Sequence, residues 1–206
     1  MFISIDGIDG TGKTTQLKRL ADYLVASGCD VCLTREPGGT PAGVAIRSIL
    51  LDKHSDISPT TELLLFCADR AEHQRKIADA LGAGQVVLCD RFLSSTIAYQ
   101  IYGRGFEKPE MLEYITKNTV TLFPDITIIL DLPVDVSIKR SLARLNNIGS
   151  SVSEGRFESE SKAFFERVRA GFMDYAKKYN AVVLDASGNE DDVFNAIKRC
   201  VDGLFG

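Results

Sequence analysis

Hydrophobic residues follow two alternating patterns along the chain. Short apolar runs rich in β-branched residues are typical of strands that are buried on both faces of a parallel sheet. The longer stretches between them carry apolar residues at three- and four-residue steps, which is the spacing of amphipathic helices. We predict strands at residues 2–5, 31–34, 86–89, 126–130 and 181–184. We predict helices at residues 13–26, 41–51, 59–81, 94–102, 109–122, 134–145, 160–179 and 190–201.

This alternation of strands and helices predicts an α/β fold, a doubly wound sheet of about five parallel strands flanked by helices. A length of 206 residues favours one domain over residues 1–206. Residues 146–155 (NNIGSSVSEG) break the alternation and are rich in Gly, Ser and Asn. Such a loop is more often a plain surface connector. Arginines at both ends favour the alternative that we adopt, a mobile lid over about residues 141–156.

Composition and charge narrow the class of protein. With 45% hydrophobic and 25% charged residues, the chain has the composition of an ordinary globular protein. Its net charge of −4 argues against general attraction to nucleic acid or to an anionic membrane. No apolar run approaches the roughly 20 residues that span a bilayer, and polar residues interrupt the start too early for a signal peptide. We therefore expect a cytoplasmic protein.

The five cysteines are an odd number and are scattered through the chain. Cys29 and Cys32 form a CxxC pair, but the chain has no second pair and only two histidines. A zinc site would lack ligands. We expect free thiols in a reducing compartment.

A glycine-rich loop separates the first expected strand from the first expected helix. Residues 7–14 (GIDGTGKT) match G-x-x-x-x-G-K-[ST], a pattern that binds nucleotide phosphates in this position. Its backbone N–H groups and the helix N-terminus attract anions. Lys13 can reach the β- and γ-phosphates, and the Thr14 hydroxyl can bind Mg²⁺. We expect ATP and Mg²⁺ here, with ATP contacted by Gly7, Ile8, Asp9, Gly10, Thr11, Gly12, Lys13, Thr14 and Thr15.

Two aspartates compete for the second magnesium-binding position. Asp90 and Asp131 each follow an apolar run, so each lies where α/β sheets bind ligands. Spacing alone does not separate them. Arg91, directly after Asp90, adds a guanidinium suited to phosphate, whereas apolar residues follow Asp131. We therefore assign the metal to Asp90 together with Thr14.

Several further blocks, in order, carry a resemblance that is more specific than the P-loop. They are REPGGT at 35–40, LFCADR at 65–70, DRF at 90–92, STIAYQ at 95–100, RFE at 156–158, FFERVR at 164–169 and DAS at 185–187. With them the sequence resembles the bacterial thymidylate kinases, P-loop enzymes that phosphorylate dTMP with ATP, over nearly the whole chain. The resemblance implies a homodimer and a cis peptide bond between Glu36 and Pro37.

The resemblance also implies which residues bind dTMP. Phe66 would stack on thymine and Arg70 would hydrogen-bond its carbonyl edge, as suits an aromatic face and a planar cation. Arg91 would bind the dTMP phosphate, and Asp9 would contact the sugar 3′-hydroxyl. The other expected dTMP-binding residues are Glu36, Pro37, Ser95, Thr96, Tyr99 and Gln100.

Phosphoryl transfer also needs positive charge beyond Lys13, and the P-loop supplies no second cation. We expect Arg144 to supply it from the lid, with Arg140 and Arg156 assisting at ATP. The family often has Asp before the last of these arginines, whereas this chain has Gly155. The expected catalytic residues are Asp9, Lys13, Arg91 and Arg144.

The expected reaction needs no general base. The second pKa of a phosphate monoester lies near 6, so the acceptor oxygen is largely deprotonated at neutral pH, and neither histidine lies beside a motif. Two alternatives stay open: a kinase for another acceptor such as dCMP, UMP or a deoxynucleoside, and a nucleotide-dependent switch or ATPase. The N-K-x-D motif of GTPases is missing from the sequence. A switch would hydrolyse ATP without an acceptor, which separates it from a kinase.

Overall fold

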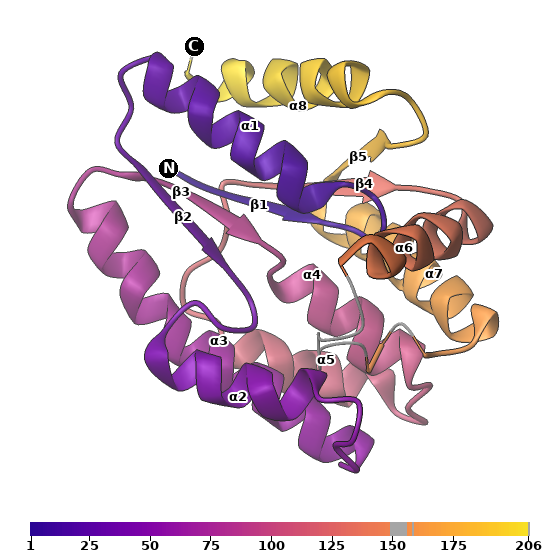
Figure 1. The fold of residues 1–206 in the computed structure, drawn as a ribbon. Coiled ribbons are helices and arrows are strands. Elements are labelled where there is room, and N and C mark those ends of the chain that lie inside the picture. The colour runs from indigo at the N-terminus through magenta and orange to yellow at the C-terminus, as the bar shows by residue number, and fades with distance from the viewer. Residues whose placement is uncertain (149–155, 158, 206) are drawn as a thin grey trace.

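A five-stranded parallel sheet with helices on both faces forms the computed structural model of the chain (Figure 1). The structure describes residues 1–148, 156–157 and 159–205, apart from the side chains of residues 144–148. The strands are β1 (Phe2–Asp6), β2 (Val31–Arg35), β3 (Val86–Asp90), β4 (Ile126–Asp131) and β5 (Val182–Asp185), in the order β2-β3-β1-β4-β5. All four strand pairings are parallel. The predicted fold class is confirmed.

The helices largely follow the predicted ranges. They are α1 (Lys13–Ala26), α2 (Pro41–Leu51), α3 (Pro59–Gly82), α4 (Leu93–Thr96), the π-helix η1 (Ile97–Gly103), α5 (Pro109–Asn118), α6 (Val134–Ile148), α7 (Lys162–Tyr179) and α8 (Glu190–Phe205). Side-chain oxygens of Thr40 and Ser58 cap α2 and α3 by accepting hydrogen bonds from backbone N–H groups. Each cap precedes a proline at the first helical position, where its missing N–H costs nothing.

Helices α6 and α8 extend to Ile148 and Phe205, beyond their predicted ends at 145 and 201, and two other predicted helices differ in type or end early. The helix predicted at 94–102 is a short α-helix followed by a π-helix, which packs closely on α7: a Cβ added at Gly103 would lie 2.7 Å from the ring of Phe164. The helix predicted at 109–122 ends at Asn118. It ends there because the buried Gln74 on α3 accepts from the N–H groups of Thr121 and Leu122 and donates to the carbonyl of Thr119.

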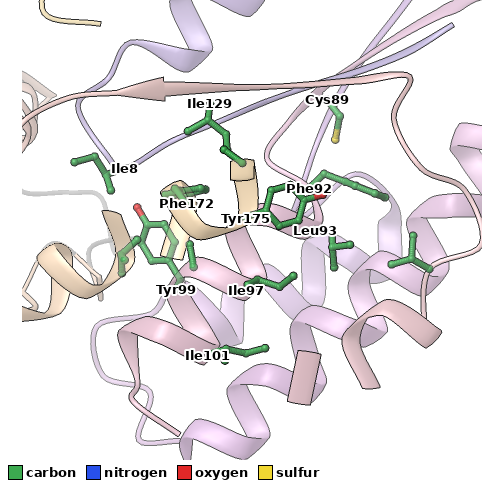
Figure 2. Close-up of a cluster of buried hydrophobic side chains, with 14 of the residues drawn as sticks. Ile8, Cys89, Phe92, Leu93, Ile97, Tyr99, Ile101, Ile129, Phe172 and Tyr175 are labelled. Atoms are coloured by element: carbon green, nitrogen blue, oxygen red, sulfur yellow. The ribbon is translucent and has the colours of Figure 1, made fainter. Parts of the chain in front are cut away.

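The core has one layer on each face of the sheet. Leu17 and Leu20 of α1 and Ile197 of α8 pack against strand residues such as Ile3 and Leu130. The opposite face carries an aromatic layer from the α3, η1 and α7 side; Figure 2 shows its members Phe92, Tyr99, Phe172 and Tyr175 among others. Alternate residues of β1 contribute to the two layers, which fixes the register of the central strand.

Four of the five strands end on an aspartate at their carboxyl ends: Asp6, Asp90, Asp131 and Asp185. Parallel register brings these ends to one edge of the sheet, where Ile5 pairs with Asp90 and Asp131 pairs with Asp185. The loops that follow this edge therefore carry the candidate site, as expected for a doubly wound sheet.

All five cysteines are free thiols, as expected. Within the described residues, no group of three or more His, Cys, Asp or Glu side chains is arranged to hold a metal ion. In the same part of the chain, no helix has the length and apolar character needed to cross a membrane.

Candidate active site

The loop between β1 and α1 has the closely packed turn that its glycines predict. Gly7, Gly10 and Gly12 all have positive φ, where a side chain would be strained. A Cβ at Gly7 would lie 2.4 Å from the carbonyl oxygen of Leu130, and one at Gly10 would lie 2.6 Å from that of Ser137. Backbone approaches as close as these exclude other residues at both positions.

Lys13 is buried at the start of α1, with 6% of its surface exposed. Its Nζ donates to the carbonyl oxygen of Ile8 at 2.8 Å. Burial, and then the positive charge of Arg91, lower its pKa from the usual 10.5 to about 8. The ammonium is therefore held inside the loop at a cost in free energy that an anionic ligand would offset.

Thr14 lies against the end of β3. Its hydroxyl donates to Asp90 Oδ2 at 2.7 Å, so the two predicted magnesium-binding residues are adjacent. Their oxygens are the hard donors that Mg²⁺ prefers, and a site with one carboxylate suits an ion that keeps its water and phosphate ligands. The rival Asp131 accepts a bidentate pair of hydrogen bonds from Arg169, both at 2.7 Å.

Arg91, Asp9 and Tyr99 form a compact triangle beside the P-loop. Arg91 Nη2 lies 2.5 Å from Asp9 Oδ1, and the Tyr99 hydroxyl donates to Asp9 Oδ2 at 2.9 Å. Arg91 Nη1 donates to the Gly7 carbonyl at 2.9 Å and to Ser95 Oγ at 3.1 Å. Burial alone would lower the pKa of Arg91, but the surrounding negative charges, including Asp9, raise it above its usual value. Arg91 therefore stays cationic.

Asp6 is a residue that sequence reasoning missed. It is fully buried at the end of β1, and its Oδ1 accepts from the Phe92 N–H at 3.1 Å and from the Ser95 hydroxyl at 2.6 Å. Both donors directly follow Arg91, which adopts φ 69°, so Asp6 fixes the chain on the carboxyl side of that turn. The available signal was a carboxylate at the end of a mostly apolar strand, which equally marks an ordinary strand end.

Arg70 lies in a buried ionic cluster on α3. Its Nε donates to Glu36 Oε2 at 2.9 Å and its Nη2 donates to Thr96 Oγ1 at 2.7 Å. Its Nη1 is buried and has no hydrogen-bond partner within the described residues. Phe66 lies one turn earlier on the same helix and is only partly buried. One donor of Arg70 is therefore available to a ligand, and the ring of Phe66 beside it is partly exposed.

The segment that leads from β2 into α2 borders this cluster. The Glu36–Pro37 peptide bond is cis, as expected. His73 Nδ1 lies 3.0 Å from Glu36 Oε1, and its Nε2 lies 2.7 Å from Thr34 Oγ1. Neither histidine lies beside a motif in the sequence, but folding brings His73 on α3 against the segment containing Glu36. Asp69 accepts from the Gly38 N–H at 3.0 Å, and burial raises its pKa to about 6.

A second buried carboxylate that sequence reasoning missed lies at the other end of the same helix face. Glu62 is fully buried and accepts from Gln100 Nε2 at 3.0 Å, from Arg104 through two donors at 3.0 and 2.8 Å, and from Arg156 Nη1 at 2.6 Å. Arg104 also pairs with Glu160 at 2.5 Å. A spacing of four residues from Glu62 to Phe66 and from Phe66 to Arg70 was the available signal.

The three lid arginines occupy different positions. Arg140 on α6 donates to the carbonyl oxygens of Ala186 at 3.0 Å and Ser187 at 3.4 Å, in the segment after β5. Arg156 binds Glu62, as described above. Arg144 belongs to α6, but its side chain lies outside the described residues, as do residues 149–155 of the expected lid. The expected catalytic contribution of Arg144 stays a prediction.

Comparisons with known proteins agree over almost the whole chain. The family model for thymidylate kinase matches residues 5–197. A thymidylate kinase of Nitratidesulfovibrio vulgaris (strain Miyazaki F) is 46% identical over 210 residues, covering 100% of this chain and 97% of that protein. One of Desulfovibrio desulfuricans is 46% identical over 209 residues, covering 100% and 96%. The crystal structure of thymidylate kinase from Ehrlichia chaffeensis is similar, with a TM-score of 0.76, 35% identity and 98% of each chain covered.

Proposed function

Because the chain belongs to the thymidylate kinase family, we propose that its P-loop holds ATP while the residues between α3 and η1 hold dTMP. The enzyme transfers the γ-phosphoryl group of ATP to dTMP, which gives ADP and dTDP for nucleotide biosynthesis.

The thymine-binding assignment is supported most directly by Arg70. A guanidinium nitrogen that is buried without a partner is costly, and a carbonyl oxygen of a bound base would remove the cost. Phe66, one turn away on α3, offers an aromatic face on which the base can stack. The other assigned residues lie on neighbouring elements, Ser95 and Thr96 on α4, Tyr99 and Gln100 on η1, and Glu36 and Pro37 just after β2.

Arg91 is assigned to the phosphate of dTMP. It is cationic, partly exposed and held in place by Asp9, Gly7 and Ser95, so it can bind an anion without first reorganising. The Asp9 carboxylate that accepts from Arg91 and Tyr99 also lies where a sugar hydroxyl could donate to it. The reaction would then need only the binding and alignment of the dTMP phosphate, and no general base.

The ATP side of the reaction is assigned to the P-loop. Lys13 would donate to the transferring phosphate, and the charge that is costly in the free protein would be matched there. Thr14 and Asp90 would hold Mg²⁺, which when bound neutralises phosphate charge. Arg140 and Arg144 remain our candidates for further positive charge around ATP, whereas the charge of Arg156 is matched by the buried Glu62.

We also propose that the protein is a homodimer in the cytoplasm. Val44 and Ile49 on α2 and Leu64 on α3 are apolar yet 59%, 44% and 56% exposed, which suits an interface between copies of the chain. Free thiols at all five cysteines suit a reducing compartment. Light scattering after size-exclusion chromatography tests the dimer, and a mass of about one chain of 22.6 kDa would contradict it.

Separate titrations with dTMP and ATP test the assignment of the two substrates. Arg70→Ala is expected to weaken dTMP binding at least tenfold and to change ATP binding less than twofold, as measured by calorimetry. Because removing Arg70 leaves Glu36 buried without its cation, a thermal melt must show that the variant is folded. Equal losses for the two nucleotides in a folded variant would mean that Arg70 is only structural.

A further inference from the structure

Glu62 is a fully buried carboxylate that the assignments above leave without a role. Four donors from Gln100, Arg104 and Arg156 converge on its two oxygens, at 2.6 to 3.0 Å. Arg104 and Arg156 suffice to balance the negative charges of Glu62 and Glu160. The contact with the uncharged Gln100 is therefore not needed for charge balance, and it has to be explained separately.

The contact with Glu62 determines which way the amide of Gln100 faces. An ionised carboxylate only accepts hydrogen bonds, and of the two amide atoms only Nε2 can donate. Facing Glu62, Gln100 must therefore present Nε2, at 3.0 Å from Glu62 Oε1, and point its Oε1 the other way. Gln100 is 1% exposed, and its side-chain hydrogen bond to Glu62 is made by Nε2, which leaves Oε1 as the atom that can accept from a ligand. The contact with Glu62 therefore fixes the amide of Gln100 so that it presents an acceptor, Oε1, on the side away from Glu62.

The position of this acceptor relates it to Arg70. Glu62, Phe66 and Arg70 follow one another at four-residue steps on α3, so they share one face of the helix. On the facing helices, Arg70 Nη2 bonds to Thr96 and Glu62 bonds to Gln100, four residues later. Arg70 Nη1, which has no hydrogen-bond partner within the described residues, and the amide of Gln100 are therefore both brought to the face of α3 that carries Phe66.

This pattern is complementary to one edge of a pyrimidine. Thymine and uracil present a carbonyl oxygen at C4, which accepts, beside a ring N3–H, which donates. Cytosine presents an amino group, which donates, beside a bare N3, which accepts. We propose that Glu62 is a positioning residue that fixes the amide of Gln100 as an acceptor, so that the site selects a pyrimidine with a ring N3–H. This inference rests on the proposed placement of dTMP between α3 and η1.

Glu62→Gln tests the proposal, because a glutamine side chain can donate as well as accept and no longer dictates the orientation of Gln100. The Kd of dTMP, dUMP and dCMP and the kcat/KM of each are measured. We expect dTMP and dUMP to weaken together by about tenfold, since both present N3–H, while dCMP is unchanged or improved. The preference for dTMP over dCMP then falls about tenfold, and that for dTMP over dUMP stays within twofold. Loosening of the site without a change in amide orientation would weaken all three ligands alike, which would overturn the proposal.

Two further variants guard against a failure to fold. Glu62→Asp keeps a negative charge beside Arg104 and Arg156 but withdraws it from Gln100 by about one bond length, roughly 1.5 Å, and it is expected to shift the same preference. Glu160→Gln is the matched control, because Glu160 pairs with Arg104 and the hydrogen bond of Gln100 goes to Glu62 instead. The preference of this variant for dTMP over dCMP should equal that of the wild type. A folded Glu62→Asp that retains the wild-type preference overturns the proposal, as does a shift of equal size in Glu160→Gln.

Gln100→Leu separates this inference from the proposed function. If the wild type does not phosphorylate dTMP, the proposed function itself fails. If the wild type does and Gln100→Leu keeps the full preference for dTMP over dCMP, then Gln100 does not read the base and the inference fails alone. The inference predicts that Gln100→Leu loses the preference and that adding Glu62→Gln to it causes no further loss of preference.

Discussion

Replacing Lys13 with methionine is expected to stabilise the nucleotide-free protein while nearly abolishing its activity. Lys13 is buried, and burial followed by the charge of Arg91 lowers its pKa from 10.5 to about 8. The folded protein therefore holds this ammonium less favourably than the unfolded chain does. Methionine has a similar length and carries no charge.

The size of the effect follows from the pKa. A change from 10.5 to about 8 corresponds to about 3 kcal/mol of unfavourable free energy for the charged group. Losing the hydrogen bond from Lys13 to the Ile8 carbonyl offsets about 1 kcal/mol of this gain. A net stabilisation of about 2 kcal/mol would raise the Tm of a chain of this size by about 4–8 °C. Removing a donor to the transferring phosphate should lower kcat by about 10²–10³-fold.

The pH dependence has a definite sign. Between pH 8 and 10.5 the unfolded chain retains the Lys13 proton and the folded protein releases it, so the unfolded state binds more protons. The stability of the wild type therefore rises with pH over this interval. The advantage of Lys13→Met is complete below about pH 8 and disappears by about pH 10.5.

Thermal melts from pH 7 to 10.5 and steady-state kinetics at pH 7.5 test this prediction together. Lys18→Met is the matched control, because Lys18 is an exposed lysine on the same helix, and it should change neither Tm nor kcat appreciably. A Lys13→Met variant that melts below the wild type at pH 7, or that keeps kcat within a few-fold, would refute the reasoning.

Three further predictions concern the P-loop, the buried cluster and the lid. Gly10→Ala should lower the Tm and the activity, because a Cβ there would lie 2.6 Å from the Ser137 carbonyl oxygen; Gly28→Ala, which has a similar φ but open space around it, carries only the backbone cost. Asp69→Asn should raise the Tm at pH 7.5. Burial raises the pKa of the Asp69 carboxyl from 3.8 to about 6, so the folded wild type binds an extra proton in this interval and loses stability as the pH rises through it. Thermal melts across this pH range should show that the variant lacks this loss. Arg144→Ala should lower kcat by about 10³-fold or more and leave the Kd of ATP unchanged, and a loss confined to Kd would move the catalytic arginine elsewhere.

The local pattern of the sequence predicted the elements that form the site. Strand cores, the P-loop and the caps at Thr40 and Ser58 depend on residues close together in the chain, so spacing was sufficient to find them. The preference for Asp90 over Asp131 likewise came from the neighbouring residue. The structure places Asp90 against Thr14 and gives Asp131 to Arg169.

The residues that were missed act through partners distant in sequence. Asp6 accepts from Phe92 and Ser95, just after Arg91, and His73 binds Glu36. Glu62 accepts from donors on η1 and in the segment after the lid. The residues next to Asp6, His73 and Glu62 in the sequence do not indicate these partners. The π-helix and the early end of α5 were missed for the same reason, because packing on α7 and the amide of Gln74 determine them.

The formation of ADP by the purified protein, measured with ATP, Mg²⁺ and a panel of acceptors, tests the central claim most directly. The panel comprises dTMP, dUMP, dCMP, UMP and thymidine, together with a reaction that contains no acceptor. The account predicts that ADP forms with dTMP at the highest kcat/KM of the panel and hardly forms without an acceptor. Equal ADP formation with and without dTMP, or a higher kcat/KM for another member of the panel, would contradict it.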